Sequence, residues 1–266
     1  MITTPASGTL LSELGHQHLG QRLAPSEVQD VTQHFAGCSP LPGYIPGRFT
    51  EAERASAYTL DGCRKRGPFA CYRLEDVLAA PHLLDAAMAP DVLEAARYVL
   101  GVPPVIYSVN VFWTFPGGAQ AGTQVFHRDF DDDKFVGMFF YLTDFTIQNG
   151  SAQRYVTGSH DSARFSAMCK TLGKMPYSHY WDRNKDAGVH ASLERDFPVV
   201  SLVGTAGTAV LMLPSGFHCG GKPRENRCIA WVRYGAGPNK VYTNDGMYPV
   251  AVPGREPSDL TRLILK

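Results

Sequence analysis

Short runs of aromatic and β-branched residues dominate the chain from about residue 103 onwards, separated by Gly, Pro, Asn and Asp. Strands favour the first group of residues and turns favour the second. The five clearest runs are Val105–Phe115, Phe135–Leu142, Val199–Val203, Thr208–Leu213 and Cys228–Tyr234. Because no helix-length segments alternate regularly with them, the pattern predicts a β-sandwich or jelly roll and not a parallel α/β sheet.

The first hundred residues show a different, helical periodicity. From Ser26 to Gly37, apolar side chains recur at helical spacing, which predicts a helix that Ser26 caps and Gly37 ends. A second helical region is predicted from Leu74 to Leu100, with breaks near Pro81 and Pro90. The N-terminal part is therefore expected to be mainly helical.

Together these patterns predict one domain over residues 1–266. Residues 1–102 form its mainly helical part, and residues 103–158 and 197–240 form the jelly-roll core. Residues 159–196 form a long stretch of mixed polarity marked by Tyr177, Tyr180, Trp181 and Arg183, so we expect an insertion or lid there. The last three of these side chains could contact substrate or could simply anchor the loop.

Composition narrows the range of partners. Lys plus Arg and Asp plus Glu number 25 each, so no basic excess is present to neutralise phosphates, and nucleic acid is not expected as a partner. No segment approaches the roughly 20 apolar residues that span a bilayer, so no membrane is expected either. The N-terminus lacks a basic, then apolar leader, and the six cysteines form no Cys-x-x-Cys pair. We expect a cytoplasmic protein.

Three residues form a candidate metal site. His127 has a carboxylate two positions on, at Asp129, and alternation along an extended segment would point both side chains to one face. His218, just beyond the predicted strand Thr208–Leu213, is placed to supply a third ligand. Two imidazoles and one carboxylate bind one face of Fe(II) and leave three positions open. The alternative is that the triplet occurs by chance and His218 is a hydrogen-bonded structural residue.

An arginine downstream of His218 helps to decide between a metal site and a chance arrangement of these residues. Arg227 follows a Gly-rich loop after His218 and opens the last strong strand. Its guanidinium fork can bind the far carboxylate of a dicarboxylic co-substrate that chelates the metal. An arginine at an exposed strand edge is the alternative interpretation.

Several short sequence motifs follow one another along the chain around these residues. They are Gln124–Asp129, Tyr141–Asp144, Asn149–Ser151, Tyr155–His160 and His218–Gly221, followed by Arg227. Through them the sequence resembles the phytanoyl-CoA dioxygenase family of Fe(II)- and 2-oxoglutarate-dependent oxygenases.

The resemblance implies a double-stranded β-helix fold and a set of site residues. It assigns His127, Asp129 and His218 as iron ligands at the catalytic centre, and Arg227 as the residue that binds the 2-oxoglutarate carboxylate. Gln124, Phe139 and Tyr141 are further candidates for the cofactor pocket.

The implied reaction uses Fe(II), 2-oxoglutarate and O2 to hydroxylate an unactivated C–H bond of a small-molecule substrate, with release of succinate and CO2. That substrate is a natural product, an amino-acid-like compound or an acyl compound. Because halogenating relatives lack the carboxylate that Asp129 supplies here, hydroxylation or a related oxidation is favoured over halogenation.

Four questions stay open at this stage. Arg224 or Arg233 could bind the carboxylate in place of Arg227, and Gly220 stands where a serine often assists co-substrate binding. The protein could instead be a cupin-like metal enzyme that does not use 2-oxoglutarate, or a non-catalytic jelly-roll binding module. The sequence fixes neither the identity of the substrate nor the oligomeric state.

Overall fold

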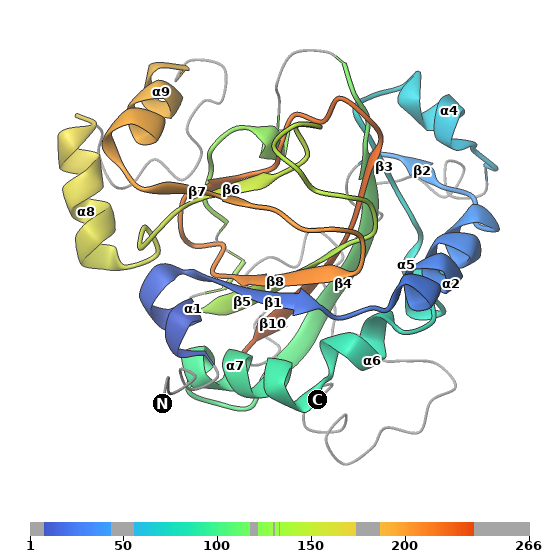
Figure 1. Ribbon diagram of the computed structural model, residues 1–266, viewed down its shortest axis with the longest axis horizontal. Coiled ribbons are helices and arrows are strands. Elements are labelled where there is room, and N and C mark those ends of the chain that lie inside the picture. Colours follow the sequence, from blue (N-terminus) through green and yellow to red (C-terminus); the bar gives the residue numbers. More distant parts are fainter. Residues whose placement is uncertain are drawn as a thin grey trace.

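Two antiparallel sheets form the centre of the molecule, and helices cover one face of the larger sheet (Figure 1). The structure is a computed structural model that describes residues 8–43, 56–117, 122–129, 131–132, 134–173 and 187–236. The larger sheet has the strand order β1-β8-β5-β10-β4-β3-β2, and the smaller has the order β7-β6-β9. This arrangement is a double-stranded β-helix, so the predicted jelly-roll fold is confirmed.

The strands of the larger sheet are β1 (His16–Gln21), β8 (Thr208–Met212), β5 (Phe135–Tyr141), β10 (Arg227–Gly235), β4 (Val105–Thr114), β3 (Phe69–Cys71) and β2 (Leu41–Pro42). Those of the smaller sheet are β7 (Val199–Leu202), β6 (Gln153–Val156) and β9 (His218–Cys219). The helices are α1 (Thr9–Leu14), α2 (Pro25–Ala36), α4 (Leu60–Arg64), α5 (Leu74–Leu78), α6 (Leu83–Ala87), α7 (Pro90–Leu100), α8 (Ser162–Thr171) and α9 (Ala187–Asp196), with a 3-10 turn, η2, at Gly122–Gln124.

The side chains of the central strands alternate between two hydrophobic cores. In β5, Met138 and Phe140 face the helices, and Phe139 and Tyr141 face the space between the sheets. The outer core joins these strands to α1, α2, α5, α6 and α7. The period of two therefore gives one face of each central strand to the helices and the other to the interior of the β-helix.

The N-terminal part departs from the prediction in its details. The helix predicted from Ser26 begins at Pro25, where a proline needs no N–H partner, and Glu27 accepts a hydrogen bond from the N–H of Ala24 at 2.7 Å. Ser26 is therefore not the cap. The breaks near Pro81 and Pro90 are confirmed, since Pro90 starts α7.

The described residues of the part predicted to be mainly helical also contain three strands, of which β1 is the longest. Its sequence lacks the aromatic and β-branched residues of the other strands, and its register comes from pairing with β8, from His16 opposite Met212 to Gln21 opposite Thr208. Tertiary pairing overrides local propensity here.

The predicted insertion over residues 159–196 contains α8 and α9, which lie together at one end of the molecule (Figure 1). Tyr177, Tyr180, Trp181 and Arg183, the residues that mark the predicted lid, lie outside the described residues. Within the described ranges, every helix is too short or too polar to cross a membrane.

Candidate metal centre

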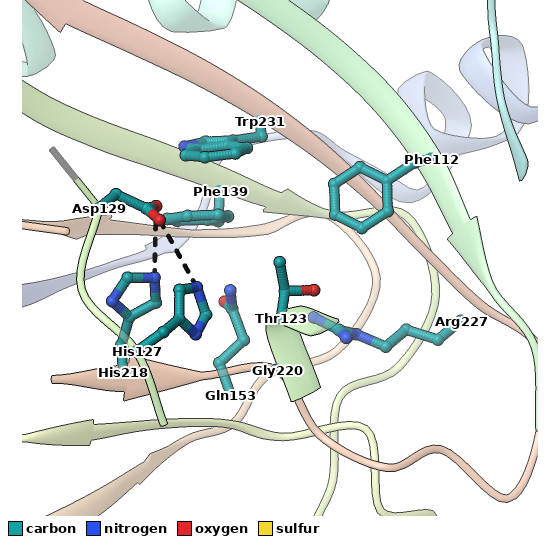
Figure 2. Close-up of a pocket in the computed structure, with 10 residues that line it drawn as sticks. All are labelled: Phe112, Thr123, His127, Asp129, Phe139, Gln153, His218, Gly220, Arg227 and Trp231. Carbon is teal, nitrogen blue, oxygen red and sulfur yellow. Dashed lines mark ion pairs between the residues drawn. The ribbon is translucent and has the colours of Figure 1, made fainter. Parts of the chain in front are cut away.

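Side chains of His127, Asp129 and His218 converge in the space between the two sheets. One ligand atom from each lies within 4.8 Å of the others. His127 Nε2 is 3.6 Å from one carboxylate oxygen of Asp129, and His218 Nε2 is 3.5 Å from the other (Figure 2). The two imidazole rings lie 4.2 Å apart between centroids. Residues that are about ninety positions apart in sequence thus face a common point.

Backbone hydrogen bonds bring these ligands together. His127 and His218 form a two-residue antiparallel bridge in which each N–H donates to the other's carbonyl oxygen at 2.9 Å. The N–H of Asp129 donates to the carbonyl oxygen of Pro214, also at 2.9 Å. The segment of His127 is therefore extended, as the prediction requires, although it forms only a single bridge and not a full strand.

Each imidazole is oriented by a carbonyl group two residues before it. His127 Nδ1 lies 2.7 Å from the carbonyl oxygen of Val125, and His218 Nδ1 lies 3.0 Å from that of Gly216. In both rings Nδ1 must carry the proton to make this contact, which leaves the lone pair of Nε2 directed at the common point. Metal-binding histidines are commonly oriented in this way.

The third side chain has the charge that a cation needs. Burial alone would raise the pKa of Asp129, but when the imidazoles also carry a proton on Nε2, the hydrogen bond from His218 and the Coulombic interactions with His218, His127 and Arg233 hold that pKa well below the usual value. Asp129 is therefore a carboxylate near neutral pH.

The His-Asp-His group forms one end of a pocket, and Arg227 forms the other (Figure 2). Arg227 is only 4% exposed, and its guanidinium carbon lies 4.6 Å from the centre of the Phe145 ring. At Gly220, a Cβ atom would come within 3.0 Å of Arg227 Nη1, so the glycine leaves room for the guanidinium group. A residue with a side chain at position 220 would crowd the proposed anion-binding end.

The alternative arginines have different surroundings. Arg224 is exposed in the loop before β10. Arg233 donates from Nη1 to Asp131 Oδ2 at 2.7 Å and does not line the pocket among the described residues. Of the three arginines, Arg227 is the one that the pocket includes.

The three further candidates for the cofactor pocket, Gln124, Phe139 and Tyr141, have different surroundings. Phe139 lines the pocket, but Tyr141 and Gln124 are absent from its described lining. The hydroxyl of Tyr141 instead donates to the carbonyl oxygen of Leu202 at 3.0 Å, and Gln124 is buried in η2. Tyr141 lies two residues further along β5 on the same face as Phe139, where its ring stacks on that of Phe145.

Four pocket residues were missed from the sequence: Phe112, Thr123, Gln153 and Trp231. Trp231 had a usable signal, because it lies four residues after Arg227 and alternation puts both on one face of β10. Phe112 sits opposite Ile229 across β4 and β10. Thr123 and Gln153 enter from η2 and β6, so only the tertiary structure places them.

Two neighbours of the ligands point away from the centre. Arg128 donates to the carbonyl oxygen of Ser215, and its guanidinium carbon lies 3.7 Å above the ring of Phe165. Cys219 is buried in the core that includes Phe165. The period of two separates these side chains from the ligands.

The Gly158–Ser159–His160 block lies behind the site and not in it. Ser159 Oγ accepts a hydrogen bond at 2.7 Å from the N–H of Phe217, the residue before His218. His160 Nε2 lies 2.8 Å from the carbonyl oxygen of Ser12, which ties the block to α1. The block supports the backbone that carries one ligand.

Fold and site together define a jelly-roll protein with a candidate centre of two histidines and one carboxylate. The chain belongs to the phytanoyl-CoA dioxygenase (PhyH) family, whose model matches residues 70–226, more than half of the 266 residues. The resemblance noted in the sequence is thereby confirmed. No curated protein matches the chain.

Solved structures with the same fold are distant in sequence. HygX from Streptomyces hygroscopicus, with nickel, 2-oxoglutarate and hygromycin B bound, is 14% identical, with 87% of each chain covered and a TM-score of 0.55. The non-heme alpha ketoglutarate dependent epimerase SnoN from nogalamycin biosynthesis is 14% identical, with 94% of this chain and 89% of that chain covered and a TM-score of 0.54. EctD from S. alaskensis, with 2-oxoglutarate and 5-hydroxyectoine, is 16% identical, with coverage of 88% and 76% and a TM-score of 0.53.

Proposed function

We propose that this protein is a mononuclear non-haem dioxygenase that uses Fe(II), 2-oxoglutarate and O2 to hydroxylate an unactivated C–H bond of a small-molecule metabolite. The observation that carries the proposal is the pocket that has His127, Asp129 and His218 at one end and the buried guanidinium group of Arg227 at the other. Membership of the phytanoyl-CoA dioxygenase family supports it.

The donor set fits iron. Two neutral imidazoles and one carboxylate, all directed at one point, are the ligands of the facial triad that leaves open positions on Fe(II). A structural zinc site would be closed by a fourth protein ligand, and among the described residues the group contains three. His127, Asp129 and His218 would hold the metal.

The rest of the pocket fits a dicarboxylate. Arg227 offers a planar, permanently charged fork at the end of the pocket away from the metal ligands, which suits the far carboxylate of 2-oxoglutarate. HygX and EctD both carry 2-oxoglutarate in their solved structures, which supports the same co-substrate here.

When bound together, Fe(II), 2-oxoglutarate and O2 supply an oxidation that releases succinate and CO2 and transfers oxygen to a C–H bond. The chain's own residues supply orientation and a dry environment. Phe112, Phe139 and Trp231 form an aromatic wall, and Thr123 and Gln153 add polar groups beside it. Such a wall excludes water and strengthens the charge interactions of Asp129 and Arg227 inside the pocket.

The class of substrate and the type of oxidation are part of our proposal. HygX has hygromycin B bound, and SnoN is an epimerase, so proteins of this fold include more than one outcome on natural products. The carboxylate of Asp129 occupies the third ligand position, which favours hydroxylation over halogenation. A natural-product, amino-acid-like or acyl substrate is proposed.

The test is a screen for succinate. The protein is incubated with Fe(II), 2-oxoglutarate and O2 against a library of metabolites, and succinate formation above the level without substrate identifies a substrate. Mass spectrometry of the product then separates the outcomes, because hydroxylation adds one oxygen atom and epimerisation leaves the mass unchanged. Substrate turnover without consumption of 2-oxoglutarate would overturn the proposal in favour of a cupin-like enzyme.

A further inference from the structure

The inner face of β10 carries a second buried arginine at the end opposite Arg227. The side chain of Arg233 is 6% exposed, and its Nη1 donates to Asp131 Oδ2 at 2.7 Å. Its guanidinium carbon lies 3.5 Å above the ring of Trp231. The hydroxyl of Tyr107 also donates to Asp131 Oδ2, at 3.4 Å. The proposed function uses none of these contacts.

These contacts connect two parts of the metal centre. Asp131 comes two residues after Asp129, so the ion pair with Arg233 holds the chain segment that carries the carboxylate ligand. Trp231 belongs to the pocket wall that faces that ligand. Arg233 therefore joins the ligand-bearing segment to the wall strand through one guanidinium group.

The wall that Arg233 contacts is closely packed. Trp231 pairs with Phe139 across β10 and β5, and their rings stack at 5.4 Å with an interplanar angle of 14°. Next to them, a Cβ atom on Gly137 would come within 2.9 Å of Trp231 Nε1 and 3.2 Å of Pro214. Pro214 in turn accepts the backbone hydrogen bond of Asp129. The closely packed indole ring of Trp231 therefore gives the guanidinium group of Arg233 a defined surface for a cation–π contact.

We propose that Arg233 is a positioning residue for the metal centre, which it serves by holding the Asp129 segment in register with the wall formed by Trp231 and Phe139. The inference rests on the metal centre of the proposed function and deepens it. It assigns no contact between Arg233 and the metal, the co-substrate or the substrate.

The charge of Arg233 and its positioning role predict opposite changes in metal affinity when Arg233 is removed. Arg233 is a permanent positive charge that lies against Asp131, two residues after Asp129, so its field disfavours a cation in the centre. Removing that charge would tighten metal binding if charge were its only effect. Loss of positioning would weaken metal binding, since residues that orient metal ligands are typically worth about 10- to 100-fold in affinity. The sign of the change separates the two effects.

The test measures the dissociation constant of Mn(II), added alone to the full chain, for Arg233→Met and Arg233→Lys. Methionine keeps an apolar stem and removes the charge, and lysine keeps the charge and removes the planar fork. The matched control is Arg22→Met, which removes the ion pair between Arg22 and Asp91 on the outer surface. Chemical unfolding of each variant without metal shows whether it is folded.

We expect Arg233→Met to weaken Mn(II) binding by about 10-fold or more, Arg233→Lys to weaken it by less, and Arg22→Met to leave it unchanged. Equal or tighter binding by folded Arg233→Met overturns the inference. If Arg233→Met does not fold, Arg233→Lys decides, and wild-type affinity in that variant overturns the inference.

The two proposals fail in different ways. Wild-type protein that binds Mn(II) but not 2-oxoglutarate contradicts the proposed function and leaves the Arg233 comparison in force. Wild-type protein that binds no Mn(II) overturns both.

Discussion

The two faces of β10 are both buried, but they differ in chemistry. Its outer face packs Cys228, Ala230, Val232 and Tyr234 against the helical core. Its inner face places Arg227, Ile229, Trp231 and Arg233 in the interior of the β-helix. Nine consecutive residues are buried on both sides of one strand.

The outer face of β10 mainly stabilises the fold, whereas the inner face carries charged groups of the candidate site. Apolar burial on the outer face contributes roughly 25 cal/mol per Å² to folding, with no charge to compensate. The inner face buries two guanidinium groups, Arg227 and Arg233, which are costly to remove from water unless other groups interact with them. Such groups add little to stability, so we expect Arg227 to serve binding of the co-substrate and Arg233 to position the metal centre. Substitutions on the two faces should therefore affect different measurements.

The largest effect is expected on the inner side, at Asp129. Asp129→Ala removes one of the three proposed metal ligands, and metal affinity should fall by more than about 100-fold, since even residues that only orient ligands are worth roughly 10- to 100-fold. Titration with Mn(II) measures this loss. The control Asp85→Ala changes an exposed carboxylate on α6 and should bind Mn(II) like the wild type. Undiminished affinity in Asp129→Ala would remove this residue from the centre.

Arg227 should show the next largest effect, on the co-substrate alone. Arg227→Ala should weaken 2-oxoglutarate binding by about 10- to 100-fold, because hydrogen bonds to charged groups are worth about 1.5–3 kcal/mol. Calorimetry with Mn(II)-loaded protein measures it. Arg224→Ala, in the exposed loop, is the matched control and should bind normally. The opposite result, with Arg224→Ala impaired, would transfer the role to Arg224.

On the outer face, Val232→Ala should change folding and not binding. Val232 is fully buried in the helical core, and loss of its two methyl groups should cost roughly 2 kcal/mol of unfolding free energy. Urea unfolding measures the loss, and Mn(II) affinity at low temperature should match that of the wild type. A large drop in metal affinity in this variant would break the proposed separation of the two faces.

The smallest effect is expected at Tyr234. Its hydroxyl donates to the carbonyl oxygen of Ala87 at 2.8 Å, which joins β10 to α6. Tyr234→Phe removes this hydrogen bond and should cost about 1 kcal/mol in urea unfolding. A change in 2-oxoglutarate affinity in place of that cost would show that the outer face also communicates with the pocket.

The sequence predicted the parts of the fold that local pattern determines. The strands that became β4, β5, β8 and β10 are long and rich in aromatic and β-branched residues, so their positions were predicted to within one or two residues. The short strands β6 and β9 were missed. The latter has two residues, His218 and Cys219, and exists because Arg154 and Tyr155 pair with it. Such elements depend on tertiary contacts.

The candidate site likewise contains residues that the sequence could predict and residues that it could not. His127, Asp129, His218 and Arg227 could be proposed because each stands in a recognisable block of sequence. The sequence favoured Arg227 over Arg233 for the carboxylate, and that role stays a prediction. The structure adds that Arg227 lines the pocket, whereas Arg233 pairs with Asp131.

The most direct test of the account is anaerobic absorption spectroscopy of the wild-type protein with Fe(II) and 2-oxoglutarate. If the His-Asp-His centre and Arg227 hold the two together, the weak visible metal-to-ligand charge-transfer band of a chelated 2-oxo acid should appear, and Arg227→Ala should need more 2-oxoglutarate to produce it. Iron bound in stoichiometric amount with no such band at saturating 2-oxoglutarate would contradict the account.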